Sequence, residues 1–102
     1  MKEWPELPNE ITLFGQPYAI EIVADLSAAV HRYGETEFYR HTISIDGGSV
    51  LSVQWATLCH EVLHVIDEAL AMGLEEEDVR RLDAGLFEFI SQLGIEGSHG
   101  NC

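Results

Sequence analysis

The sequence predicts an α+β fold in which a small antiparallel sheet of about three strands packs on a long helix and on a second, antiparallel helix that follows it. In the first half of the chain, apolar and polar residues alternate as they do in strands with one buried face. In the second half, apolar residues recur at the helical period over residues 50–72 and 75–93. The length of 102 residues suits one domain spanning 1–102, with irregular tails expected at 1–9 and 95–102.

Three segments are expected to form the sheet. Residues 11–14 and 18–23 flank Gly15-Gln16-Pro17, and two apolar runs around such a sequence predict a β-hairpin. Residues 38–46 should form the third strand, with a turn at 46–49 because Asp, Gly and Ser favour turns. The side chains expected on the buried face are Ile20, Ile22, Ile43 and Ile45, with Tyr18 beside them.

The segment 24–33 between the second and third strands allows two interpretations. Asp25 can cap a short helix that Gly34 would end, or the segment can be a loop with one helical turn.

Two helices fill the second half of the chain. The first should begin at Val50 or Ser52 and run to Met72, with Gly73 ending it. The second should cover residues 75–93, and four acids at 75–78 suit its first turn because the helix dipole favours negative charge there. The short connection makes the two helices antiparallel neighbours. The second helix carries an apolar stripe of Val79, Leu82, Leu86, Phe89 and Leu93.

Charge excludes two classes of partner. The net charge is −13, with five Lys and Arg against 18 Asp and Glu, whereas phosphate groups of nucleic acids or anionic membranes require a basic surface. No apolar run reaches membrane-spanning length, and residues 1–9 lack the apolar core of a signal peptide. We therefore expect a cytoplasmic protein.

The two cysteines fit a reducing compartment such as the cytoplasm. Cys59 is expected to be a buried apolar residue, and Cys102 a free thiol in a Gly-rich tail.

The most informative stretch is His60-Glu61-Val62-Leu63-His64, an H-E-x-x-H motif inside the first predicted helix. Residues four apart on a helix lie about 40° apart around its axis, so both imidazoles share one face and can bind one Zn²⁺. Glu61 lies beside them, where a carboxylate can take a proton from an attacking water. The motif is typical of metal-assisted hydrolysis, most often of peptide bonds.

Two histidines are too few for a zinc site, so a third ligand must come from elsewhere. The second helix begins about ten residues after His64 with its acidic run. On a helical wheel Asp78 and Glu76 lie on opposite flanks of the apolar stripe, and Glu77 points away if the first turn is regular. All three acids stay open as the third ligand at this point. Asp67 is either a hydrogen-bonding partner of the site or an ordinary surface acid.

The other histidines, His31, His41 and His99, have no spacing that links them to the motif, and we expect them to be ordinary polar residues. The sequence contains no Ser-His-Asp arrangement, no Gly-rich phosphate loop and no Cys-x-x-Cys pair.

The order of elements around the motif from Thr57 to Asp67, with Gly73-Leu74 and an acidic helix start after it, resembles small gluzincin-type zinc metallopeptidases (zincins). It is similar above all to phage and prophage H-E-x-x-H proteins related to the ImmA/IrrE family, and the resemblance covers about residues 11–93. It implies one zinc ion held by His60, His64 and an acid of the next helix, with Glu61 as general base. Relatives often carry that acid as a glutamate six residues before a Leu or Phe, and counting back from Leu82 favours Glu76, ahead of Asp78 and Glu77.

The resemblance also implies that the strand before the motif helix, here residues 42–46, binds the substrate backbone by β-augmentation. The chain departs from the family at Asp83, where relatives usually have a small residue, and no Tyr or His matches the oxyanion donor of larger gluzincins. These departures predict weak, latent or absent catalysis.

The favoured function is thus a zinc metallopeptidase of a minimal zincin-like domain, acting on a protein or peptide substrate. The alternative is a non-catalytic zinc-binding regulatory or structural protein of the phage type, and a metal-free relic ranks third. Glu61 favours the enzyme, since structural zinc needs no general base, and the missing oxyanion donor favours the binding protein.

Overall fold

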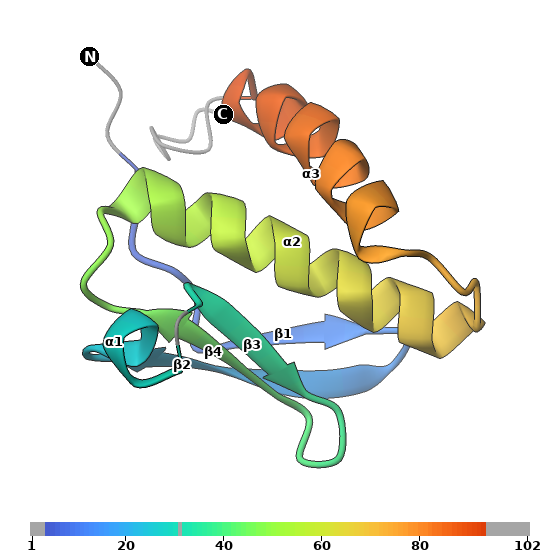
Figure 1. Ribbon diagram of the computed structural model, residues 1–102, viewed down its shortest axis with the longest axis horizontal. Helices are drawn as coiled ribbons and strands as arrows, with labels where there is room; N and C mark the ends of the chain where they lie inside the picture. The colour runs from blue at the N-terminus through green and yellow to red at the C-terminus, as the bar shows by residue number, and fades with distance from the viewer. Residues whose placement is uncertain (1–3, 31, 94–102) are drawn as a thin grey trace.

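The structure is a computed structural model that describes residues 4–30 and 32–93. It is an α+β fold in which helix α2 lies between a four-stranded sheet and helix α3 (Figure 1). None of the described helices is long and apolar enough to cross a membrane. In chain order the elements are β1 (Glu10–Leu13), β2 (Gln16–Val23), α1 (Leu26–Val30), β3 (Gly34–Glu37), β4 (Thr42–Asp46), α2 (Leu51–Leu70) and α3 (Glu76–Ser91).

The prediction of about three antiparallel strands is wrong in two respects. The sheet has a fourth strand, β3, and its order β1-β2-β4-β3 makes β2 and β4 parallel neighbours. Strand β3 has the sequence Gly-Glu-Thr-Glu, which contains no large apolar residue and so gives no alternation to recognise. The third strand predicted at 38–46 is shorter, because residues 38–41 form the turn that joins β3 to β4. That turn reverses the chain, and β4 therefore runs parallel to β2.

The predicted hairpin is present with a tighter turn. Phe14 and Gly15 both have positive φ, 54° and 79°, and they form a two-residue connection in place of the expected Gly15-Gln16-Pro17. Pro17 lies inside β2, but pairing with β4 begins only at Ala19, so its missing N–H removes no bond to β4.

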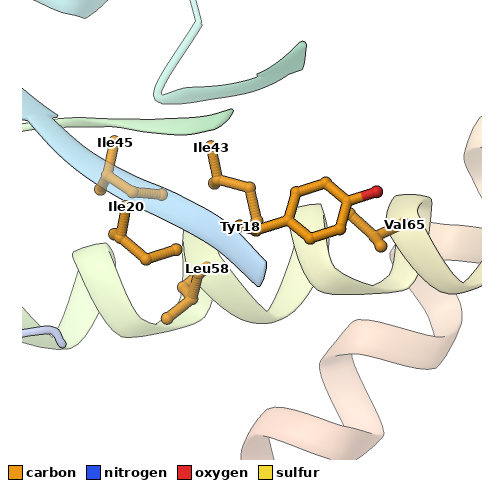
Figure 2. Packing of buried hydrophobic residues seen from close by; sticks show 6 residues of the cluster. All are labelled: Tyr18, Ile20, Ile43, Ile45, Leu58 and Val65. Carbon is orange, nitrogen blue, oxygen red and sulfur yellow. The ribbon is translucent and has the colours of Figure 1, made fainter. Parts of the chain in front are cut away.

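The core lies between the sheet and α2. Figure 2 shows six of its side chains gathered there, and two of them, Ile43 and Ile45, are completely buried. Burying such a side chain stabilises the fold by about 1.5–3 kcal/mol. Ile22 is half exposed, contrary to the prediction, so the buried face of β2 ends at Ile20. The six residues are Tyr18, Ile20, Ile43, Ile45, Leu58 and Val65.

The segment 24–33 contains the short helix α1 rather than a loop, but Asp25 does not cap it. Asp25 has a positive φ of 63°, and the carboxylate of Asp46 accepts a hydrogen bond from the Ser27 N–H at 3.3 Å. Asp46 also accepts a bond from the Ser49 hydroxyl at 3.0 Å, in the turn predicted at 46–49. One buried carboxylate therefore joins the start of α1 to the segment that leads into α2.

Helix α2 ends two residues earlier than predicted. Its C-cap is Ala71 in the left-handed conformation, and Gly73 follows with a positive φ of its own. Helix α3 begins at Glu76 with Glu75 as its N-cap and ends at Ser91 with Gln92 as its C-cap, so it is shorter than the predicted 75–93.

Side chains from the N-terminal segment help to fix α3 on α2. Val79 of α3 is completely buried, and Trp4 stacks on Phe87 of α3 with 5.3 Å between the ring centroids. Trp4 also contacts Trp55 of α2, whose indole N–H donates to the Pro5 carbonyl at 2.7 Å. In the predicted N-terminal tail, residues 4–9 contain no helix or strand. The described part of the chain excludes residues 1–3 and 94–102, and therefore the whole predicted C-terminal tail.

Candidate metal centre

The two histidines of the motif lie on one face of α2, as their spacing predicts. His60 Nε2 and His64 Nε2 are 3.2 Å apart, and their side chains are 20% and 28% exposed. Leu58 and Val65 anchor the same helix in the core, so α2 turns the histidines away from the sheet and toward α3.

The three acids left open by the sequence have three different partners. Glu76 meets both histidines: Oε2 lies 3.0 Å from His60 Nε2, and Oε1 lies 3.2 Å from His64 Nε2. Glu77 pairs with Arg81 at 2.8 Å. Asp78 accepts a hydrogen bond from the backbone N–H of Glu75 at 3.1 Å, as part of a capping box. Only Glu76 is therefore placed to complete a site with the histidines.

The spacing of these ligand atoms fits a zinc ion. One nitrogen of each histidine and a carboxylate oxygen of Glu76 all lie within 4.8 Å of one another. Ligand atoms around a tetrahedral zinc, each about 2.0–2.1 Å from the metal, stand about 3.3 Å apart. The observed contacts of 3.0–3.2 Å are close to this value.

The contacts of His60 suit either a bound cation or a hydrogen on each ring nitrogen. Its Nδ1 lies 2.5 Å from Asp83 Oδ2, and a carboxylate only accepts, so Nδ1 carries a hydrogen. His60 Nε2 lies 3.0 Å from Oε2 of Glu76, which is also an acceptor. This contact requires a hydrogen on Nε2 or a cation between the two atoms.

Asp83 holds His60 in the orientation that metal-binding histidines usually take, with the second ring nitrogen donating to a carboxylate. The sequence marked position 83 only as a departure from a family pattern. It lies seven residues after Glu76, which is two helical turns and hence the same face of α3. That spacing was the available indication that the two acids could act together.

Glu61 is 7% exposed, and its Oε1 accepts a hydrogen bond from the Thr36 hydroxyl at 2.7 Å. Thr36 belongs to β3, the strand that the sequence did not predict, so this contact could not be foreseen. The bond fixes the Glu61 carboxylate against the sheet edge while leaving its second oxygen to other partners.

A cavity of about 740 Å³ lies between β3, α2 and α3. Glu61 lines it together with both histidines and Glu76, so the motif residues share one space. Asp83, Thr36 and two arginines, Arg32 and Arg80, also line it. Such a volume is within the usual range for small-molecule and peptide-side-chain sites.

Asp67 and His41 lie outside this group. Asp67 Oδ1 accepts from the Leu74 N–H at 3.0 Å, and it therefore stabilises the connection from α2 to α3. His41 contacts Gln16 and the Tyr18 ring. The predictions for His31, His99 and Cys102 fall outside the described residues.

Cys59 is buried next to the site, and its sulfur is not disulfide-bonded. Burial, with the negative charge of Asp83, raises the pKa of the thiol to about 11. Cys59 is thus a neutral apolar residue near pH 7 and does not compete as a thiolate with the imidazoles for a metal.

Comparisons of the chain with protein-family models, with curated proteins and with solved structures found no significant match. The function is therefore inferred from the geometry of the site.

Proposed function

We propose that this protein is a zinc-dependent metallopeptidase of the minimal zincin-like type, with one zinc ion held by His60, His64 and Glu76. The observation that carries the proposal is the convergence of these three ligand atoms within 4.8 Å beside Glu61 in one cavity. Three protein ligands leave a tetrahedral position open, as in catalytic zinc sites. When bound, zinc would act as a Lewis acid on the substrate carbonyl and lower the pKa of water.

Glu61 would act as the general base. Its carboxylate would accept a proton from water as the new C–O bond forms at the peptide carbonyl carbon. It would return that proton to the amide nitrogen as the C–N bond breaks, so the amine leaves neutral. Thr36 holds one Glu61 oxygen, which would aim the other at the water, and Asp83 would keep the His60 ring in its ligating orientation.

The extended part of the substrate would bind at β3, not at residues 42–46 as the resemblance implies. β4 is paired on both sides, with β2 and with β3, so its backbone groups are already used. β3 is an edge strand, and Gly34, Glu35 and Thr36 line the cavity. An edge strand can pair with an added peptide, which supports β3 as the strand for the proposed β-augmentation.

A non-catalytic zinc-binding protein is the second candidate, and one observation favours it. The three ligands come from α2 and α3, so a bound metal would tie the two helices together and stabilise a small fold. A purely structural role does not require Glu61, which therefore distinguishes the two functions.

The first experiment is the metal content of purified wild type and four variants. We expect about one zinc per chain in wild type, Glu61→Gln and Glu77→Gln, and loss of zinc in His64→Ala and Glu76→Gln. Glu77→Gln is the matched control for Glu76→Gln, because the charge change is the same and the neighbouring side chain pairs with Arg81 instead. A zinc-free wild type whose melting temperature does not respond to added metal would overturn both zinc functions.

Cleavage of a fluorescently labelled unfolded protein such as casein then separates the two candidates. The enzyme requires cleavage that is lost in Glu61→Gln while zinc is retained. Zinc binding with no cleavage by wild type across a panel of unfolded proteins would favour the non-catalytic protein.

A further inference from the structure

Two of the four arginines of this acidic chain line the same cavity as the candidate metal centre. The net charge is −13, yet Arg32, just before β3, and Arg80 of α3 both face this space. The other two pair with acids outside it, Arg40 with Glu37 and Arg81 with Glu77. The cavity therefore holds two of the five basic residues, although four acids line it as well.

Arg80 lies close to the ligand atoms. Its Nε is 3.6 Å from Glu76 Oε2, the same oxygen that lies 3.0 Å from His60 Nε2. At 3.6 Å the contact is an ion pair rather than a hydrogen bond, in contrast to the 2.8 Å bond between Arg81 and Glu77. The guanidinium donors of Arg80 thus keep hydrogen-bonding capacity beside the site.

Metal binding would change the charge around Arg80. The ligand set of two neutral imidazoles and one carboxylate carries one negative charge, so a bound dication leaves an excess of about one positive charge. Glu76 would then share its charge with the metal and hold Arg80 less strongly. Glu35, Glu61 and Asp83 also line the cavity, so an anion is expected only beside the metal and the two arginines.

We propose that Arg80, assisted by Arg32, forms an oxyanion-binding subsite next to the metal and that the substrate complex places a negatively charged oxygen there. This inference rests on the proposed metal centre. The oxygen could belong to a carboxylate that the substrate already carries, or it could be the carbonyl oxygen that becomes negative when water adds to the peptide carbon. In the second case Arg80 supplies the donor that the sequence lacks at the positions used by larger gluzincins.

Arg81 provides a matched control for Arg80. The two side chains are neighbours on α3, are 71% and 72% exposed, and each pairs with the glutamate four residues before it. Gln at either position removes the same charge from the same helix. Only Arg80 lines the cavity, so only Arg80→Gln should affect an anion bound there.

The test uses Co²⁺ in place of zinc, because its visible absorption reports both metal binding and a ligand at the open position. Wild type, Arg80→Gln, Arg80→Lys and Arg81→Gln are titrated with inorganic phosphate, a tetrahedral anion, and with acetate, a planar carboxylate. We expect Arg80→Gln to weaken anion binding about tenfold, Arg80→Lys to weaken it less, and Arg81→Gln to leave it unchanged. A loss for phosphate alone would assign the subsite to the tetrahedral oxygen, and a loss for both anions to a substrate carboxylate.

Failure of the subsite can be told apart from failure of the metal centre. Full Co²⁺ binding with the same anion affinity in Arg80→Gln and wild type would overturn the role of Arg80 alone. A wild type without a Co²⁺ spectrum would overturn the metal centre and the subsite together. Arg80→Lys keeps the inference testable if Arg80→Gln does not fold.

Discussion

Alanine in place of Gly34 tests how closely β3 lies on α2, which sets the position of Thr36 against Glu61. A Cβ at Gly34 would lie 2.4 Å from Thr57 Cγ2 and 3.3 Å from Glu61 Cγ. Carbon atoms in contact are ordinarily about 3.5–4.0 Å apart, so β3 or Thr57 would have to move by about an ångström. Overpacking of this kind costs about 1–3 kcal/mol, and we expect Gly34→Ala to lower the free energy of unfolding by about 2 kcal/mol.

Thr57→Ser removes the methyl group that causes the clash. Alone it should cost up to about 0.8 kcal/mol, the value of one buried methylene-sized group. Combined with Gly34→Ala it should restore stability, because the new methyl group fills the vacated space. Urea unfolding followed by tryptophan fluorescence gives all four stabilities, and restored stability corresponds to a favourable coupling of about 2–3 kcal/mol in the double-mutant cycle, the sum of the two single losses. A double variant no more stable than Gly34→Ala would refute the close packing of β3 on α2.

Three further predictions concern single side chains. Asp83→Asn should weaken metal binding about 10- to 100-fold in a chelator competition, because His60 loses its carboxylate partner, whereas Glu88→Gln on the same helix should have no effect. Burial acts to raise the pKa of Asp46, but its hydrogen bonds from Ser27, Ser49 and Gly48 lower the pKa below the ordinary 3.8. The stability that ionised Asp46 adds is therefore present above about pH 4 and lost as the pH falls through the lower folded-state pKa. Asp46→Asn should reduce that acid-induced loss in urea titrations at several pH values, and an unchanged pH dependence would contradict it. Cys59, with a pKa of about 11, should resist iodoacetamide at pH 8 in the folded protein and react after urea unfolding, as peptide mass spectrometry would detect.

Local patterns in the sequence were enough to locate most elements. The alternation around Ile43 and Ile45 and the helical period on both sides of residue 73 depend only on which face each residue presents, and a single strand or helix fixes that face. The four-residue spacing of His60 and His64 likewise determined that they share a face, and helix geometry alone brings their Nε2 atoms together.

The sequence could not determine the strand order or the full set of residues around the motif. β3 has no apolar pattern because its sequence, Gly-Glu-Thr-Glu, contains no large apolar residue, and its position beside β4 depends on pairing between backbones. Thr36 reaches Glu61 only because that pairing brings β3 against α2. That residues 42–46 are paired on both sides could not be foreseen for the same reason, since an edge is a property of the whole sheet.

The acidic start of α3 shows most clearly what the sequence determines and what the tertiary structure determines. Its three acids are Glu76, Glu77 and Asp78. The acidic run at the start of the second helix and its short distance from His64 were evident from the sequence, and they limited the third ligand to these three neighbours. Consecutive residues on a helix point about 100° apart, so the rotation of α3 about its own axis determines which carboxylate meets the histidines. That rotation is set by the burial of Val79 against α2 and the stacking of Phe87 on Trp4, contacts between residues far apart in the chain. The residue types alone therefore determined the chemistry of the proposed ligands, the family resemblance favoured Glu76, and tertiary packing determined which acid lies beside the histidines.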